Sequence, residues 1–239
     1  MKHNGDVVFE KEGCIAYISI NKASSMNAID ADLAEAIGKV IKEVGRDPAI
    51  KVVIISGSGG KAFCAGADIK YLSTLKDGVE ARRFSEEMHD LFNSIEALEK
   101  IVIAAIEGYC LGGGCELAMA CDLRIAGSSS VFGQPEVKLG LVPGGGGTYR
   151  LQQIVGVGNA KELFSISPLF LRPVLINFFE RRTALALLLH ISSASSFASV
   201  SAVPAFTTLL TNPILNASSA LMLLPENMSS FAFPTPTIC

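Results

Sequence analysis

Hydrophobic residues in the N-terminal part of the chain fall into short runs that are typical of strands. The run at residues 14–20 is bounded by Gly13 and Asn21, two residues that commonly end strands. The runs at residues 52–55 and 101–106 are wholly apolar, which predicts strands buried on both faces of a sheet.

Between these runs, apolar residues recur with the spacing of one helical face. The first such face covers residues 33–44 and is followed by Asp47-Pro48, which stops a helix. A second face covers residues 84–98, a third helical stretch opens at Gly112, and residues 123–126 favour a further strand. This alternation of strands and helices predicts an α/β fold with crossover helices.

The pattern breaks near residue 164. All 22 glycines lie at or before Gly158, and only five of the 43 charged residues lie in residues 164–239. We therefore predict a catalytic domain over residues 1–163 and an atypical tail over residues 164–239, rich in Ser, Leu and Pro. We hypothesise that this tail arises from a shifted reading frame or a splice-like replacement.

The tail has apolar segments but no segment of the length that a membrane span needs. Residues 184–191 are apolar, and serines follow at once, whereas a spanning helix needs ~20 mostly apolar residues. We expect no membrane span there, and instead a poorly ordered segment that promotes aggregation.

Charge and cysteine usage exclude several classes of protein. The formal net charge of −3 is not the excess of positive charge that proteins use to bind nucleic acid or an anionic membrane. No two of the six cysteines have C-x-x-C spacing, so we expect neither a zinc site nor a redox motif. Most of them lie in apolar runs, as free thiols do, and the N-terminus lacks the apolar core of a secretion signal. We expect a cytoplasmic location.

In two segments, a turn of small residues follows a strand and leads into the start of a helix. The strand at 52–55 leads into residues 62–69, and the strand at 101–106 leads into residues 112–117. Helix N-termini present unpaired N–H groups, and small residues let a ligand approach them closely. Either turn alone is simply a tight turn, but two N–H groups aimed at one point make an oxyanion hole.

Two glutamates accompany these turns. Glu116 follows Gly113 by three residues, close to one helical turn, and the residues after it are apolar. We therefore expect a buried Glu116, and burial raises a carboxyl pKa, which suits acid–base chemistry. Glu136 follows the turn at residues 132–135 and, taken alone, is typical of a solvated turn residue. Asp68 either caps its own helix or contacts a ligand.

Four motifs in this part of the chain together resemble a known family. Residues 62–70, 103–118, 132–136 and 141–148 resemble, in order and spacing, the signatures of the enoyl-CoA hydratase (crotonase) family. The resemblance runs from about residue 7 to about residue 163. It implies an α/β fold in which ββα units repeat in a spiral, incomplete here at the C-terminus because the tail does not match.

The resemblance also implies a chemistry. An acyl-CoA thioester would bind through its carbonyl oxygen to the backbone N–H groups of Ala67 and Gly113, with Glu116 and Glu136 as the catalytic pair. The resemblance implies no metal and no cofactor. Coenzyme A is part of the substrate and is therefore not counted as a cofactor. The family usually assembles as homotrimers or hexamers, and no nucleic acid or membrane partner is expected. The further residues implied in substrate binding are Ala65, Asp68, Ile69 and Gly112.

Three functions stay open at this point. The first is a hydratase that adds water to the double bond of a short- or medium-chain 2-enoyl-CoA. The second is an enoyl-CoA double-bond isomerase, because two glutamates and one oxyanion hole can also move a proton between C2 and C4. The third is a truncated, non-catalytic member of the family.

Overall fold

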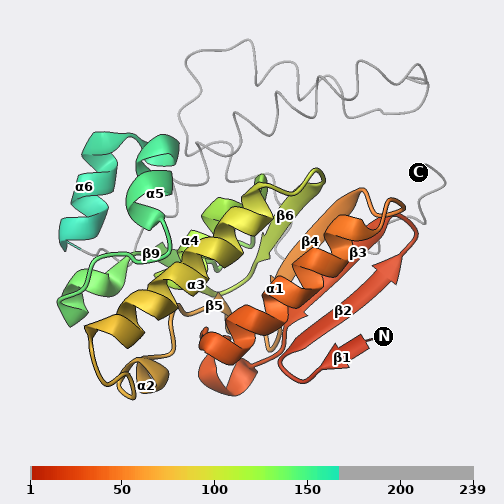
Figure 1. Ribbon diagram of the computed structural model, residues 1–239. Helices are drawn as coiled ribbons and strands as arrows, with labels where there is room; N and C mark the ends of the chain where they lie inside the picture. Colours follow the sequence, from red (N-terminus) through yellow and green to blue (C-terminus); the bar gives the residue numbers. More distant parts are fainter. Residues whose placement is uncertain (1, 167–239) are drawn as a thin grey trace, which may run out of the picture. The chain divides into compact units, whose positions relative to one another are not determined.

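The computed structural model describes residues 2–166, and the predicted tail lies outside them except for its first three residues. Strands and helices alternate along this part of the chain, as the hydrophobic pattern predicts (Figure 1). Within residues 2–166, nine strands form two sheets. The first sheet has the order β1(Lys2–Asn4), β2(Val7–Glu12), β3(Ile15–Ile20), β4(Val52–Gly57), β6(Ile101–Ile106) and β8(Leu123–Ala126). The second has the order β5(Ala62–Cys64), β7(Tyr109–Leu111) and β9(Val131–Gly133).

Three strands of the first sheet, β4, β6 and β8, each continue into a short strand of the second and then into a helix. The units β4–β5–α3, β6–β7–α4 and β8–β9–η2 follow this plan, so the predicted repetition of ββα units is confirmed. The helices are α1(Ala31–Arg46), α2(Ile69–Leu72), α3(Gly78–Glu96), α4(Gly113–Ala120), α5(Gly147–Val155) and α6(Val157–Ile166), with the 3-10 helices η1(Ala23–Ser25) and η2(Pro135–Leu139).

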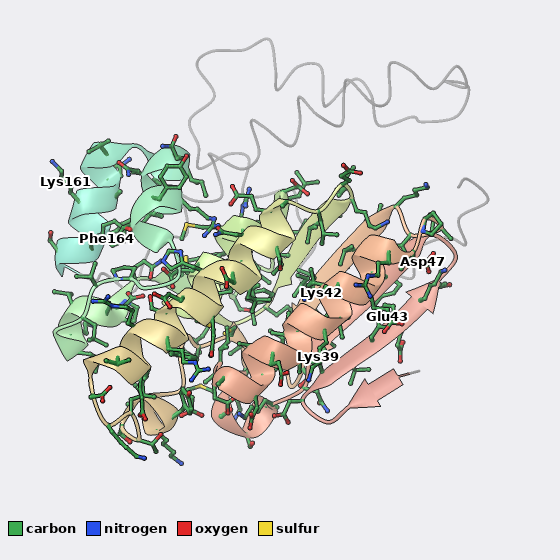
Figure 2. The ribbon with its side chains drawn as sticks, viewed as in Figure 1. Lys39, Lys42, Glu43, Asp47, Lys161 and Phe164 are labelled. Carbon is green, nitrogen blue, oxygen red and sulfur yellow. The ribbon has the colours of Figure 1, made fainter. Side chains whose placement is uncertain are left out.

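The helices begin and end where the sequence places their signals. Asp30 precedes α1, and its side chain accepts a hydrogen bond from the N–H of Leu33 at 3.0 Å, the usual N-cap interaction. The helix ends at Arg46, directly before Asp47-Pro48. Its buried residues repeat at helical spacing, and Lys39, Lys42 and Glu43 project from the helix (Figure 2).

Helices α1 and α3 run across one face of the six-stranded sheet (Figure 1). Phe92 and Ile95 on α3 and Ile37 on α1 are fully buried. The strands alternate in burial: Val53 and Ile55 are buried, whereas the residues between them are half-buried. The prediction of strands buried on both faces is therefore wrong for β4 and β6, each of which buries only one face fully.

Helix α6 crosses the boundary that the composition suggests. It continues to Ile166 and carries the exposed Lys161 and the half-buried Phe164 (Figure 2). Residues 167–239 hold the rest of the predicted tail, and the expectations made for them lie outside the described residues. Within residues 2–166, no helix is both long enough and apolar enough to cross a membrane.

Candidate active site

The small three-stranded sheet gathers the candidate residues at one edge. Its strands are parallel, with Cys64 paired to Cys110 and Leu111 paired to Gly133. The carboxyl ends of parallel strands meet at the same edge of a sheet. The segments that follow β5, β7 and β9 therefore come together, and they contain the predicted oxyanion residues and Glu136.

The backbone of the first segment is held by the loop before α1. The N–H of Ala65 donates to Met26 O at 3.0 Å, and the N–H of Ile29 donates to Gly66 O at 2.8 Å. The N–H of Asp68 donates back to Ile29 O at 2.8 Å. Successive N–H groups of extended backbone point to opposite sides. The N–H of Ala67 therefore points away from Ile29.

The second segment places the start of α4 against Ala67. A Cβ built on Gly113 would lie 3.4 Å from the backbone nitrogen of Ala67, so the two residues are adjacent. Gly112 has a φ of +49°, in the region that favours glycine. Among the hydrogen bonds within residues 2–166, none has the N–H of Ala67 or of Gly113 as its donor. The two residues are therefore neighbours, and their role as an oxyanion hole stays a prediction.

Glu116 lies on the first turn of α4 and is buried, as predicted, with 3% of its surface exposed. Its Oε1 accepts hydrogen bonds from the N–H groups of Gly145 at 2.9 Å and Gly147 at 2.7 Å. Burial raises the pKa of the Glu116 carboxyl. The two N–H donors, and then the positive charges of His89 and Arg150, act in the opposite direction because they favour the ionised form.

The glycines around Glu116 leave no room for side chains. A Cβ on Gly145 would lie 2.6 Å from the Phe92 ring and 2.7 Å from Glu116 Oε2. A Cβ on Gly147 would lie 2.8 Å from Glu116 Oε1. The glycine run at 144–147 therefore lets backbone N–H groups reach a buried carboxylate, which explains why no side chain is found there.

Glu136 lies at the start of η2, beside the second glycine turn. Its Oε1 would be 3.1 Å from a Cβ built on Gly112, which places the carboxyl over the N-terminal end of α4. The side chain is half-buried, and burial raises its pKa to about 7. Its own backbone N–H favours the ionised form, and the negative charge of Glu116 favours the protonated form. Glu136 is thus not the solvated turn residue that its local sequence suggests.

Gln134 supports Glu136. It is buried, and in the amide orientation that satisfies its surroundings its nitrogen donates to the two carboxylate oxygens of Glu136 at 2.7 and 3.0 Å. This residue lies inside a motif that the sequence analysis quotes, but its role there was missed. Only its spacing of two residues from Glu136 hints at the contact.

The remaining predicted residues lie around the first segment. Asp68 caps α2, because its Oδ1 accepts from the N–H groups of Lys70 at 2.8 Å and Tyr71 at 3.3 Å. Ile69 is 61% exposed and Ala65 is half-buried. Of the two alternatives for Asp68, the structure shows the cap, and its contact with a substrate stays a prediction.

Asn27 is a supporting residue that the sequence analysis missed. It is fully buried, with a φ of +58°, and its Nδ2 donates to Ala62 O at 2.8 Å and Ser58 O at 3.0 Å. Its Oδ1 accepts from the N–H of Lys22 at 3.0 Å. Asn27 thereby ties the loop before α1 to β5. A single asparagine between Met26 and Ala28 gives no sequence signal of this role.

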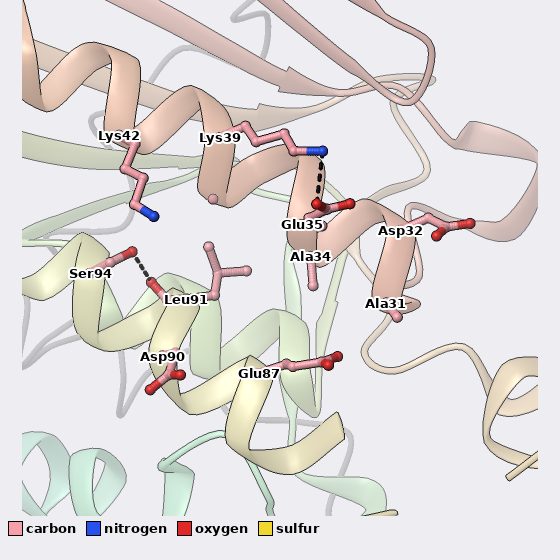
Figure 3. Close-up of a pocket in the computed structure, with 11 residues that line it drawn as sticks. Ala31, Asp32, Ala34, Glu35, Lys39, Lys42, Glu87, Asp90, Leu91 and Ser94 are labelled. Atoms are coloured by element: carbon pink, nitrogen blue, oxygen red, sulfur yellow. Dashed lines mark hydrogen bonds and ion pairs between the residues drawn. The ribbon is translucent and has the colours of Figure 1, made fainter. Parts of the chain in front are cut away.

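A groove of about 760 Å³ lies elsewhere, between α1 and α3 (Figure 3). It includes none of the eight predicted site residues. Its walls carry charges of both signs, with Lys39 paired to Glu35 at 2.8 Å and Glu87 and Asp90 opposite them. Such side chains are typical of solvated helix faces, so we place the chemistry at the edge of the small sheet and not in this groove.

The described cysteines and acidic residues do not form a metal centre. Cys64, Cys110, Cys115 and Cys121 are buried free thiols. Burial raises the pKa of Cys64 and of Cys121 to about 12, so both stay protonated and pack as small hydrophobes. Over residues 2–166, no three His, Cys, Asp or Glu side chains converge as a metal site requires.

Comparison with known proteins agrees with this geometry. A family model described as enoyl-CoA hydratase/isomerase matches residues 10–170, which is more than half of the chain. The chain belongs to the enoyl-CoA hydratase/isomerase family. The resemblance found in the sequence is thereby confirmed, and the match reaches seven residues beyond the predicted boundary at 163.

Individual members of the enoyl-CoA hydratase/isomerase family are similar over the same region. A crotonyl-CoA hydratase of Syntrophomonas wolfei is 50% identical over 158 residues, and a short-chain-enoyl-CoA hydratase of Clostridium acetobutylicum is 47% identical over 158 residues. Each alignment covers 66% of this chain and 60% of the relative. The chain thus spans less than two thirds of the length of these relatives.

Solved structures of the family confirm the predicted fold class. An enoyl-CoA hydratase from Bacillus anthracis has a TM-score of 0.70 and 31% identity, with 79% of this chain and 77% of that chain covered. An enoyl-CoA hydratase from Thermoplasma volcanium has a TM-score of 0.70 and 28% identity, with 90% and 96% covered.

Proposed function

We propose that this protein is an enoyl-CoA hydratase that adds water across the 2,3 double bond of a short- or medium-chain 2-enoyl-CoA thioester. The observation that carries the proposal is that two carboxyl groups with raised pKa values, near enough for their charges to interact, lie on the segments that follow β7 and β9, where two adjacent residues are proposed to supply the oxyanion donors. Glu116 and Glu136 supply the carboxyls, and Ala67 and Gly113 supply the donors. The names of the curated relatives support the same activity.

The proposed reaction starts with charge moving onto the thioester oxygen. As a hydroxyl adds to C3 of the enoyl group, an enolate develops, and the N–H groups of Ala67 and Gly113 stabilise its oxygen. Loss of one such donor typically costs ~3–4 kcal/mol. Ala65, Ile69, Asp68 and Gly112 are proposed to contact the acyl-CoA around this point.

Proton transfer then divides between the two glutamates. Glu116, ionised, accepts a proton from the water as its oxygen bonds to C3. Glu136, protonated, gives its proton to C2. The product carries the hydroxyl of the water on C3 and the proton of Glu136 on C2. Glu116 then loses its proton to solvent and Glu136 takes one up, which restores the starting state of both carboxyls. We propose that this chemistry needs no cofactor beyond the coenzyme A of the substrate.

The wider setting is proposed on the family resemblance. We infer a homotrimeric or hexameric assembly and a cytoplasmic location, with no nucleic acid partner. We also propose that residues 164–239 differ from the C-terminal region that other members use to complete the domain.

The test uses the full-length protein with crotonyl-CoA. Hydration is followed by the loss of absorbance of the conjugated thioester, and the double variant Glu116→Gln/Glu136→Gln is the control. Hydration that disappears in the double variant supports the proposal. A wild-type protein that instead isomerises a 3-enoyl-CoA without hydrating crotonyl-CoA would make it an isomerase, and a protein inactive on both would make it a non-catalytic member.

A further inference from the structure

The loop that holds Glu116 is itself anchored by one buried arginine. Arg150 lies on α5, and only 6% of it is exposed. Its Nη1 donates to Gly145 O at 3.0 Å. That carbonyl lies between the two N–H groups, of Gly145 and Gly147, that donate to the carboxylate of Glu116.

The other donors of the same guanidinium reach α3. Its Nη2 donates to Asn93 Oδ1 at 2.7 Å and to Glu96 Oε2 at 2.8 Å, and its Nε donates to Glu96 Oε2 at 3.1 Å. A guanidinium has donors in a fixed planar fork, so it can join three acceptors in one geometry, whereas an ammonium cannot. Arg150 therefore joins the glycine loop to α3. On one side it binds Glu96, and on the other it binds the carbonyl of Gly145 in the loop that holds Glu116.

The charge of Arg150 also acts on Glu116. The charged or titratable groups that face Glu116 are His89 from α3, Arg150 from α5 and Glu136 from η2. Arg150 is always ionised. Among these three groups, Arg150 is thus the one whose charge does not change with pH.

We propose that Arg150 is a positioning residue for Glu116: it holds the Gly145–Gly147 backbone so that two N–H groups meet the carboxylate, and it places a fixed positive charge beside that loop. The kinetic part of this proposal rests on the hydratase function proposed above. The positioning part rests on geometry alone and has a readout without turnover.

The readout without turnover is the pH dependence of the amide chemical shifts of Gly145 and Gly147 in the full-length protein. Both amides donate to Glu116, so their chemical shifts follow its ionisation as the pH is varied. In Arg150→Met the loop loses its anchor and the carboxylate loses a nearby charge, so the midpoint moves to higher pH than in the wild type. Arg83→Met is the matched control, because Arg83 on α3 is 81% exposed and, within residues 2–166, its ion pair is with Glu87 at 3.7 Å.

Two further variants separate charge from shape. Arg150→Lys keeps the positive charge but loses the planar fork of donors. The midpoint of the amide titration should therefore stay near the wild-type value. The Gly145 and Gly147 amide resonances should broaden, because the loop then takes up several conformations. Glu96→Gln leaves Arg150 in place, and since the Glu96 side chain is 55% exposed the variant should fold even if Arg150→Met does not. Glu96→Gln weakens one of the contacts that hold the guanidinium, so the Gly145 and Gly147 amide resonances should broaden in the same way but less.

The kinetic readout is hydration of crotonyl-CoA over a range of pH. We expect Arg150→Met to lower kcat by about 10²-fold, the scale of a small misplacement of a catalytic group. KM should change little, and the acidic limb of the kcat profile should move to higher pH. Arg150→Lys should recover part of kcat. An arginine that only stabilised the fold would lower the melting temperature but move neither the amide midpoint nor the acidic limb.

The outcomes distinguish this inference from the proposed function. If the wild type does not hydrate crotonyl-CoA, the hydratase proposal fails, and a shifted amide midpoint in Arg150→Met still supports the positioning role. If the wild type is active and both the amide midpoint and kcat of Arg150→Met match those of Arg83→Met, the inference is overturned. Unchanged Gly145 and Gly147 amides in Glu96→Gln would overturn it too, should Arg150→Met fail to fold.

Discussion

Glu116 and Glu136 are both carboxyl groups shielded from solvent, but different kinds of donor hold them in place. Glu116 is almost completely buried, and fixed backbone N–H groups of a glycine loop hold it. Glu136 is half-buried at the start of η2, and the side-chain amide of Gln134 holds it. The first carboxyl has two donors from the glycine loop and nearby positive charge, while the second has the Gln134 amide, its own backbone N–H and a nearby negative charge.

The difference teaches how two identical side chains can take opposite roles. Burial raises both pKa values, but the donors around Glu116 oppose that effect and the charge of Glu116 adds to it at Glu136. Different surroundings can give two carboxyl groups of one site the roles of base and acid. This difference supports the proposed roles of Glu116 as the ionised base and of Glu136 as the protonated acid.

Replacing either carboxyl should have the largest effect. Glu116→Gln and Glu136→Gln should each lower kcat for crotonyl-CoA hydration by about 10²–10⁴-fold, because each removes a proton-transfer group. Binding of a CoA ester, measured by calorimetry, should be nearly unchanged. Near-normal turnover by either folded variant would remove that glutamate from the mechanism.

Disturbing the rigid support of Glu116 should come next. Gly147→Ala would place a Cβ 2.8 Å from Glu116 Oε1, so the carboxylate must move, and we expect about a 10²-fold loss of kcat. Gly158→Ala is the matched control, since a Cβ on this helical residue meets nothing within 4 Å. Equal activity of the two variants would show that the glycine loop does not fix Glu116.

Disturbing the support of Glu136 should cost less. Gln134→Leu removes one amide that donates to the carboxylate, and a hydrogen bond of ordinary strength corresponds to about a 10-fold change in rate. The measurement is kcat for hydration in the same assay as Gly147→Ala. A loss larger than that of Gly147→Ala would reverse the ranking of the two supports.

The smallest effect concerns stability. The pKa of Glu136 is raised to about 7 in the fold from 4.5, so the fold favours the protonated form. Its contribution to stability is complete below pH 4.5 and is lost as the pH rises through about 7. Glu136→Gln is neutral at every pH, so its unfolding free energy relative to the wild type should increase between pH 5 and pH 8.

Urea unfolding at the two pH values measures this change, and Glu10→Gln on the exposed face of β2 is the control. A relative stability of Glu136→Gln that stays constant between the two pH values would contradict the raised pKa.

The sequence predicted the parts of this site that depend on local pattern. The long strands and the helices α1, α3 and α4 follow from apolar spacing, and the burial of Glu116 follows from the apolar residues after it. The strands β5, β7 and β9 have three residues each, too few for an alternation to be recognised. The resemblance to the family, rather than periodicity, pointed to the segments that they carry.

The support of the two carboxyls could not be predicted from pattern. Glu116 and the N–H groups that hold it are about 30 residues apart, and Arg150 and Glu96 are separated by 54 residues. Contacts of this range depend on how the two sheets place the loops. The burial of Glu136 has the same origin, because pairing of β9 with β7 brings its turn against Gly112.

The most direct test of the assigned roles is a titration of both carboxyl groups in the full-length protein. Carbon-13 resonances of labelled glutamate side chains, assigned with Glu116→Gln and Glu136→Gln, report the two ionisations separately. We predict that Glu136 titrates at about pH 7, and the proposed role of Glu116 as the base requires that it loses its proton before Glu136 does. A Glu136 that titrates at its ordinary value, or a Glu116 that stays protonated after Glu136 has ionised, would contradict the assignment of Glu116 as base and Glu136 as acid.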